Sequence, residues 1–245
     1  MSACESEGPR PAIPRLCFIT DLALAPDTLQ ERAAKPRRGD APPQIDGDLS
    51  IAAGNRLNSP ITLALAAGLP CLMLREKNLP EDRLIALAVE LGGLARRHGG
   101  RLVVHSSAAA ALASGAWGLH LTFEAFRRLS LQNGAVAGLK NKGLNIGVSV
   151  HSVDEAAFCR AAGADLIMAG HIFESPCKAG LPGRGLDFLA KAAEVGPPVW
   201  AVGGLNPERA GLAFAAGAAG ICVRSAWLSG DAGKITREFL RAVGQ

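Results

Sequence analysis

The sequence predicts a (β/α)8 TIM barrel, an α/β fold, formed as a single domain. The chain has 245 residues, of which 49% are hydrophobic, and this fits one barrel of roughly 250 residues with a sizeable core. Short apolar runs alternate along the chain with helix-like stretches, and eight such units can be counted. The runs are nearly continuous in apolar residues, which is typical of parallel strands covered on both faces. An open, doubly wound sheet is the alternative fold.

The expected strands are these short apolar runs. They occur at Leu16–Thr20, Cys71–Leu74, Arg101–Val104, Gly118–Leu121, Asn145–Val150, Leu166–Ala169, Val199–Val202 and Gly220–Val223. The carboxyl ends of all strands meet at one rim of a parallel barrel, and active sites lie there. The residues that follow each run are therefore the candidates for function.

Helix signals between the runs support this count independently. Asn206 before Pro207 is a capping residue followed by a first-turn proline, and Ser152 with Glu155 has the spacing of a capping box. The stretch Pro80–Arg97 carries apolar residues near helical period, with acidic residues early and basic residues late. The helix dipole favours that order of charges.

The segments before and after the first strand are irregular. Residues 1–14 contain little apolar sequence and several prolines, so we expect a flexible tail before a barrel over residues 15–245. The first βα connection is rich in Pro, Gly and charge, which predicts an inserted loop at about residues 32–58. A loop on that side of a barrel borders the active site. The insertion is either a lid or a tolerated surface excursion.

Composition narrows the possible partners. The net charge is +4 and no run of five basic residues occurs, so neither nucleic acid nor a membrane surface is expected as a partner. No leader pattern opens the chain, and no cysteine pair has the C-x-x-C spacing, which predicts a cytoplasmic protein. A homodimer remains possible. The six cysteines are Cys4, Cys17, Cys71, Cys159, Cys177 and Cys222.

The seventh and eighth strands predict a phosphate site. Gly203 and Gly204 follow the seventh strand, directly before the helix that begins at Asn206, and Arg224 and Ser225 follow the eighth. Backbone N–H groups at such places bind anions, and barrels commonly bind phosphate there. A simple tight turn at the glycines, and an Arg224 that pairs with a helix, are the alternatives. If the site exists, Gly204→Val should weaken ligand binding far more than folding.

The fifth and sixth strands offer acid/base chemistry. His151 ends the fifth strand, and Lys178 lies in the sixth loop; histidine exchanges a proton near neutral pH. The alternative is that His151 only caps the next helix. Other polar side chains at the rim are candidates for substrate binding: Arg75, Lys77, His105, His120, His171, Glu174, Ser175 and Cys177. No H-x-H, H-E-x-x-H or G-x-S-x-G pattern is present, so neither a catalytic zinc site nor a serine hydrolase is expected.

Several long segments, in order, resemble one family. They are LREK (Leu74–Lys77), GVSVHSVDEA (Gly147–Ala156), GADLIMAGHIFESPCKAGLPGRG (Gly163–Gly185), AVGGLNPERA (Ala201–Ala210) and GICVRSA (Gly220–Ala226). Together they resemble the thiamine-phosphate-synthase/TenI superfamily over nearly all of the chain from Arg15 to Leu228, except for the insertion. The resemblance implies a (β/α)8 barrel that functions in thiamin biosynthesis.

The sequence departs from the synthase branch of this superfamily. In that branch aspartates after the third and fourth strands hold the magnesium of a pyrimidine pyrophosphate. This chain has Ser106 and Ala125 at the two places, with Glu124 beside the second. Neither residue supplies the carboxylate that Mg²⁺ prefers, and a pyrophosphate leaving group relies on such charge neutralisation. We therefore expect no metal and no cofactor.

The sixth loop instead resembles the TenI branch, the thiazole tautomerases. This resemblance implies that His151 is the acid/base residue and that the partner is a small phosphorylated thiazole with a carboxylate, which Lys178 and Arg75 would bind. The first hypothesis is thus an isomerase. The second is an unusual thiamine phosphate synthase, a transferase. The third is a regulatory barrel without catalytic activity.

Overall fold

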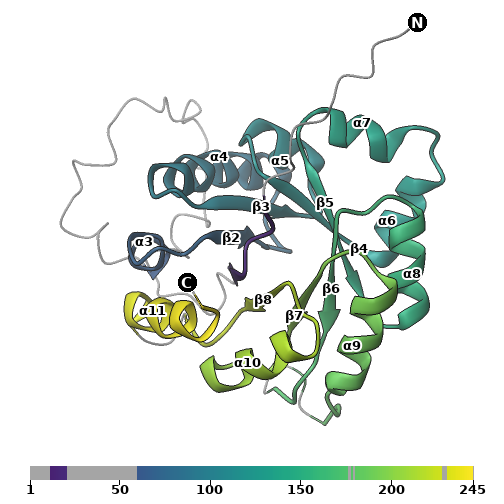
Figure 1. Ribbon diagram of the computed structural model, residues 1–245. Coiled ribbons are helices and arrows are strands. Elements are labelled where there is room, and N and C mark those ends of the chain that lie inside the picture. Colours follow the sequence, from purple (N-terminus) through teal and green to yellow (C-terminus); the bar gives the residue numbers. More distant parts are fainter. Residues whose placement is uncertain (1–11, 21–59, 176–177, 179, 228–230, 245) are drawn as a thin grey trace, which may run out of the picture.

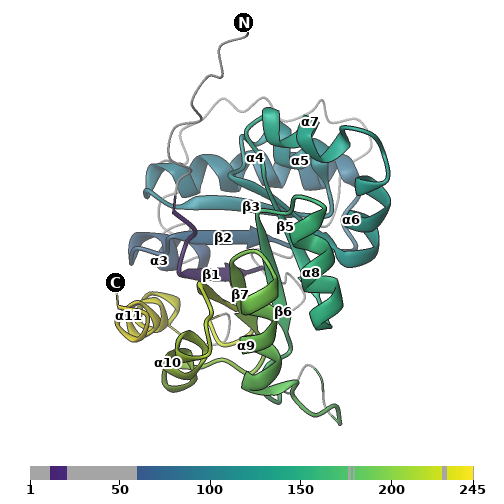
Figure 2. The ribbon, with the colours of Figure 1, turned by 45° about the vertical axis from the view of Figure 1, so that its right-hand side comes forward.

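The computed structural model describes residues 12–20, 60–175, 178, 180–227 and 231–244. These residues form a closed barrel of eight parallel strands in sequential order, β1 to β8, in which β8 pairs with β1. Figure 1 and Figure 2 show the strands at the centre of the molecule and the helices around them. The predicted TIM barrel is confirmed, and the closed sheet rules out the open alternative.

The strands occur where the apolar runs are, with differences of one residue at some carboxyl ends. They are β1 Leu16–Ile19, β2 Cys71–Leu74, β3 Arg101–His105, β4 Gly118–Thr122, β5 Asn145–Val150, β6 Leu166–Gly170, β7 Val199–Val202 and β8 Gly220–Val223. The described helices are α3 Pro60–Ala66, α4 Glu81–Arg97, α5 Ala108–Ala113, α6 Phe123–Ser130, α7 Ala135–Asn141, α8 Val153–Ala161, α9 Gly185–Val195, α10 Pro207–Ala215 and α11 Ala232–Ala242. The expected insertion at 32–58 lies outside the described residues.

Helix caps follow the sequence signals, with one difference. The Asn206 side chain accepts from Arg209 N at 2.8 Å, and Pro207 is the first residue of α10. The Ser152 hydroxyl accepts from Glu155 N at 3.1 Å. The carboxylate of Glu155, however, accepts from the backbone N–H of His151 at 2.6 Å, where a capping box would return to Ser152. The reciprocal bond therefore fixes the backbone at the end of β5.

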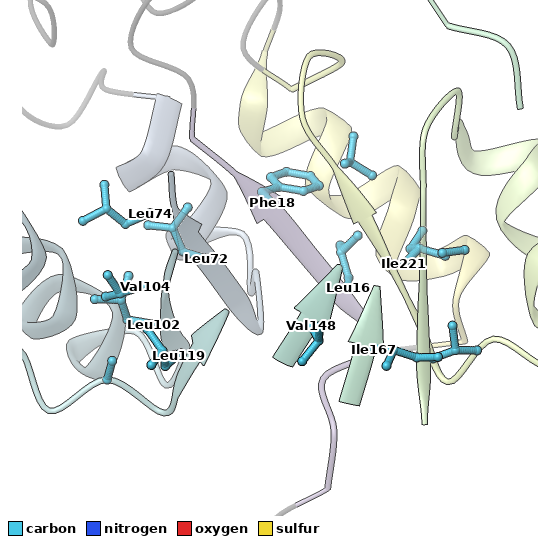
Figure 3. Packing of buried hydrophobic residues seen from close by; sticks show 14 of the residues in the cluster. Leu16, Phe18, Leu72, Leu74, Leu102, Val104, Leu119, Val148, Ile167 and Ile221 are labelled. Carbon is cyan, nitrogen blue, oxygen red and sulfur yellow. The ribbon is translucent and has the colours of Figure 1, made fainter. Parts of the chain in front are cut away.

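Side chains alternate between two apolar layers along each strand. The larger layer lies between strands and helices, and Figure 3 shows part of it, including Leu16, Phe18 and Leu72. The other layer fills the barrel interior and consists of Cys17, Ile19, Cys71, Met73, Val103, Leu166, Met168, Trp200 and Cys222. Because the interior is packed, a ligand has room at the rim rather than in the middle of the barrel.

The amino ends of the strands are closed by aromatic rings and by the segment before β1. The rings of Trp117 and Trp200 lie 6.3 Å apart between centroids. Trp200 Nε1 donates to Pro14 O at 2.8 Å, and Arg101 donates to the carbonyl of Ala12. Residues 12–14, expected at the end of a flexible tail, thus lie against the base of the barrel.

The cysteines of the described residues are free thiols at buried places. Burial raises the pKa of Cys17 and Cys71 well above the usual value, and it raises the pKa of Cys159 to about 12. These thiols therefore stay protonated and unreactive at neutral pH. Along the same residues, no helix combines the length and the apolar character that crossing a membrane requires.

Candidate active site

His151 stands at the carboxyl end of β5 with one ring nitrogen bound to the protein. Its Nδ1 lies 2.9 Å from the backbone oxygen of Gly170, at the end of β6. A carbonyl oxygen only accepts, so Nδ1 carries the proton, and in the neutral ring Nε2 keeps a lone pair. Ser152, not His151, caps α8, so the capping alternative is wrong. The exposed ring therefore presents the lone pair of Nε2.

Two further histidines lie side by side on β3 and β4. The rings of His105 and His120 are 5.7 Å apart between centroids. His105 Nδ1 is 2.7 Å from the Ser106 hydroxyl, and His120 Nε2 is 2.8 Å from the Ser149 hydroxyl. His120 is 1% exposed, and its Nδ1 has no hydrogen-bond partner among the described residues. His120, predicted to bind substrate, is therefore buried, and its Nε2 is engaged by Ser149.

Burial and nearby cations keep both rings neutral. Burial lowers the pKa of His105 to about 4, with further effects from Arg75 and Lys77. Burial lowers the pKa of His120 to about 3, with smaller effects from His105 and Arg75. The charges of Arg75 and Lys77 thus act on His105, and the charge of Arg75 also acts on His120. Two cationic side chains together with two neutral histidine rings suit a ligand that carries an anionic group.

Acid is expected to destabilise the barrel through these two rings. In the unfolded chain a histidine takes up its proton near pH 6.5, whereas in the folded chain His105 and His120 do so only near pH 4 and pH 3. Below pH 6.5 the unfolded state therefore binds more protons, and stability falls as the pH falls towards 3. Urea midpoints measured against pH should show this slope. The slope should be shallower in His120→Gln, and an identical slope in that variant would contradict the assignment.

The backbone of Arg75 is held at the rim by residues that follow β1 and β2. Its backbone N–H donates to the Thr20 hydroxyl at 3.0 Å, and that hydroxyl donates to Glu76 at 2.6 Å. Lys178, proposed from the sequence to act with Arg75, is exposed and begins a turn in which Leu181 N donates to its carbonyl at 3.0 Å. The joint role of Lys178 and Arg75 remains a prediction.

The sixth loop is tied to the end of β6. His171 Nε2 lies 3.2 Å from Leu181 O, so this ring fixes the loop rather than pointing freely at the rim. Glu174 is exposed and Ser175 is partly buried in the same loop, and both remain predicted ligand contacts. Cys177 lies outside the described residues.

The two glycines after β7 lie at the end of the barrel where the sequence predicts a phosphate site. β7 and β8 are neighbours, so their loops meet at one end of the barrel. Gly203 and Gly204 both have positive φ, at 99° and 62°. Ser225, at the end of β8, is exposed beside the partly buried Arg224. These features support the predicted site without testing it.

The start of α10 contributes less to this site than expected. Pro207 has no N–H, and the N–H of Arg209 is taken by the Asn206 side chain. Only Glu208 keeps a first-turn N–H for a ligand, and its own side chain is acidic. The anion-binding potential of this region therefore rests on the glycine backbone and on β8 rather than on the helix.

The reasoning behind Gly204→Val is wrong. A Cβ on Gly204 would lie 2.4 Å from Glu174 O and 2.7 Å from Phe173 Cβ. The added side chain would therefore strike the sixth loop rather than stand in the path of an anion. This substitution tests packing, and the phosphate site needs a different one.

Ser225→Asp is expected to abolish binding of phosphorylated ligands while the barrel stays folded. Ser225 is exposed, so the carboxylate has space, but it would stand as a like charge beside the anion. Ser225→Ala, which loses only a hydroxyl, should bind more weakly by about tenfold. Isothermal titration with inorganic phosphate or sulfate measures both. Equal affinity of Ser225→Asp and the unchanged protein would place the phosphate elsewhere.

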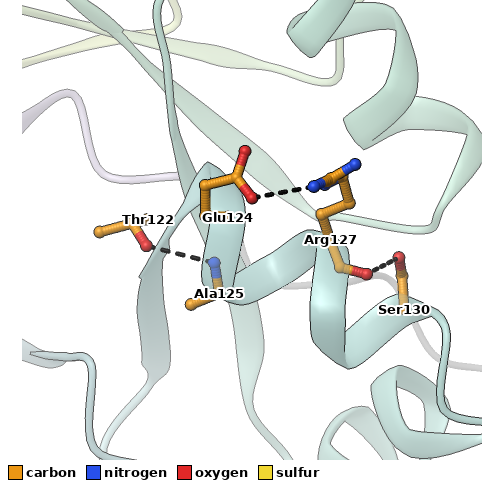
Figure 4. Close-up of polar contacts among 5 residues, drawn as sticks. All are labelled: Thr122, Glu124, Ala125, Arg127 and Ser130. Atoms are coloured by element: carbon orange, nitrogen blue, oxygen red, sulfur yellow. Dashed lines mark hydrogen bonds and ion pairs between the residues drawn. The ribbon is translucent and has the colours of Figure 1, made fainter.

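The residues at the family's magnesium positions do not fit the ion. Ser106 bonds to His105, and the backbone of Ala125 is bound by the Thr122 cap at 3.3 Å. Glu124, the nearby carboxylate, pairs with Arg127 at 3.2 Å (Figure 4). No cluster of three metal-binding side chains occurs among residues 12–20, 60–175, 178, 180–227 and 231–244. One paired, exposed carboxylate is a poor match for a cation that is bound by carboxylates and phosphate oxygens.

Three features define the class of protein. The strands are parallel and sequential, the barrel interior is filled, and basic and histidine side chains lie at the carboxyl ends of the strands. The protein is a (β/α)8 barrel of the kind that carries its function at that rim. A family profile described as thiamine monophosphate synthase matches residues 48–227. The chain belongs to this thiamine-phosphate synthase/TenI family, whose enzymes act in thiamin biosynthesis.

Individual relatives agree with this assignment. A putative thiamine-phosphate synthase from Geobacter sulfurreducens is 39% identical over 73% of this chain and 83% of its own length. A thiamine-phosphate synthase from Gloeobacter violaceus is 34% identical over 74% of this chain, which spans only 52% of that relative. The structure of thiamine phosphate pyrophosphorylase from Pyrococcus furiosus has a TM-score of 0.69 at 27% identity and covers 94% of this chain and 95% of its own. These names favour the synthase branch, and none of them specifies TenI.

Proposed function

We propose that this chain is a metal-independent isomerase of a phosphorylated thiazole, a thiazole tautomerase. The observation that carries this proposal is the state of His151, whose Nδ1 is bound to Gly170 O at 2.9 Å. Such a ring offers a lone pair at Nε2 and can return the proton from the same atom. A tautomerisation needs one such shuttle, because a proton leaves one carbon and a proton is returned to another.

The remaining requirements of that reaction have candidates at the same rim. The carboxylate of the substrate would face Arg75, with Lys178 as a second cation. Its phosphate would lie against the backbone of Gly203 and Gly204, near Ser225. The neutral rings of His105 and His120 would form an uncharged wall next to Arg75. Each group would bind or orient the substrate, and His151 would move the proton.

The second candidate is a thiamine phosphate synthase, and the names of the relatives favour it. That reaction joins a thiazole phosphate to a pyrimidine with loss of pyrophosphate. The magnesium of that leaving group would have Ser106, Ala125 and the paired Glu124 as its neighbours here. Their chemistry supports the isomerase instead, since the developing negative charge on pyrophosphate needs a cation close by.

Two assays on purified protein separate these functions. We expect turnover of the carboxylated thiazole phosphate tautomer, unchanged by Mg²⁺ or by EDTA, because Ser106 and Ala125 supply no carboxylate for the ion. Thiazole phosphate with pyrimidine pyrophosphate and Mg²⁺ should give no thiamine phosphate. A strict Mg²⁺ requirement with thiamine phosphate as product would establish the synthase. Tight binding of thiazole phosphate without either reaction would establish a regulatory barrel.

A further inference from the structure

The sixth loop returns to the strand that it leaves and binds there through its backbone. Gly183 packs so closely that a Cβ would lie 2.4 Å from Ile172 O. Arg184 N donates to His171 O at 2.9 Å, and Gly185 N donates to Ile172 O at 3.0 Å. Gly185 has a φ of 80°, which favours glycine. The sequence Gly-Arg-Gly thus fixes the backbone of Arg184 beside the end of β6.

The side chain of Arg184 extends this contact to a third carbonyl. Its Nε donates to Gly170 O at 3.2 Å, and its guanidinium carbon lies 5.6 Å from the centre of the Phe188 ring. Consecutive carbonyls at 170, 171 and 172 therefore accept from Arg184 Nε, Arg184 N and Gly185 N. The guanidinium is exposed but is located by a hydrogen bond on one side and a ring on the other.

Gly170 O is also the acceptor of His151 Nδ1, at 2.9 Å. A carbonyl oxygen has two lone pairs, and here one receives Arg184 and the other receives His151. The peptide itself has little room to move, because a Cβ on Gly170 would lie 2.4 Å from Val202 Cγ1. The orientation of the His151 ring is thereby joined to the closing residue of the sixth loop.

We propose that Arg184 is a positioning residue, which holds Gly170 O where it keeps the proton on His151 Nδ1 and the lone pair on Nε2. The inference rests on the proposed role of His151 as the acid/base residue. It adds that the hydrogen bond from Arg184 Nε to Gly170 O sets the acceptor that His151 Nδ1 uses.

The direct test is the tautomer of His151. Histidine ¹⁵N chemical shifts at alkaline pH distinguish protonated Nδ1 from protonated Nε2, and a His151→Gln sample identifies the resonances. We expect the Nδ1–H form in the unchanged protein and a mixture of both forms in Arg184→Gln. Arg160→Gln is the matched control, because Arg160 also donates to a glycine carbonyl, that of Gly196, at the far end of the strands. It should keep the Nδ1–H form.

Kinetics separate positioning from substrate binding. Arg184→Gln should lower kcat on the order of tenfold with KM nearly unchanged, less than the 10²–10⁴-fold that a general acid/base contributes. Arg184→Lys keeps a cationic donor and should recover part of both the tautomer and kcat. Arg160→Gln should match the unchanged protein in both.

The outcomes bear on Arg184 and on the proposed function separately. An unchanged tautomer in both Arg184 variants overturns the proposal, whatever happens to turnover. A rise in KM at constant kcat also overturns it, because Arg184 would then bind substrate. If the thiazole tautomer is not a substrate, the proposed function fails, while the ¹⁵N measurement still decides whether Arg184 sets the His151 ring. If Arg184→Gln fails to fold, Arg184→Met, which keeps the length of the side chain but has no donor, gives the same reading.

Discussion

His151→Ala is expected to lower kcat for thiazole isomerisation by about 10²–10⁴-fold and to leave the barrel folded. The ring is exposed and makes one hydrogen bond, to Gly170 O, so its loss removes little packing. The backbone bond from His151 N to the Glu155 carboxylate does not depend on the side chain. Steady-state turnover with circular dichroism of the same sample measures both effects.

His98→Ala provides the control for this variant. His98 is an exposed histidine at the carboxyl end of α4, and its N–H closes that helix through the backbone. It should turn over substrate at the unchanged rate. Normal turnover in His151→Ala would remove this residue from the mechanism, and an unfolded His151→Ala would show that the ring has a structural role.

Gly204→Val is expected to destabilise the barrel by roughly 2–5 kcal/mol. The φ of 62° disfavours a branched side chain, and the added carbons would meet the backbone of Phe173 and Glu174 within 2.4–2.7 Å. Backbone does not rotate away as a flexible side chain does, so β7 and the sixth loop must separate. The midpoint of urea unfolding should fall accordingly.

Gly134→Val is the control that separates the cost of a positive φ from the cost of the steric clash at Gly204. Gly134 has a similar φ of 73°, but a Cβ there meets nothing within 4 Å. The unfolding free energy of Gly134→Val should fall only by the cost of the left-handed conformation, roughly 1–2 kcal/mol. Equal destabilisation by Gly134→Val and Gly204→Val would show that the close approach of the two loops is not what Gly204 serves.

The strands could be predicted because their pattern is local. Each apolar run is buried on both sides and is bounded by a cap or a turn, so the boundaries could be read to within a residue at most ends. The same alternation could have revealed Ser149, which lies on the side of β5 that His151 and Gly147 share. It was missed because a serine inside an apolar run carries no signal of its own, and its partner His120 comes from another strand.

Other features of the site depend on contacts between segments that are far apart in the sequence, and no local pattern reveals such contacts. The direction of a Cβ on Gly204 is decided by how the sixth loop lies across the seventh, a contact between segments about thirty residues apart. The burial of His120 follows from the closing of the barrel around it. The hydrogen bond from Arg184 to Gly170 O also arises only when the loop has returned to its strand.

The closed base has a kinetic consequence. Trp117, Trp200 and the residues before β1 shut the amino end of the strands, and the interior is filled with side chains. If the proposed function holds, substrate and product would then enter and leave at the carboxyl end of the described strands. A product that keeps the phosphate and the carboxylate would occupy that end until it dissociates. Escape of the product, and competition between it and fresh substrate, would then govern the turnover of this barrel as directly as the movement of the proton.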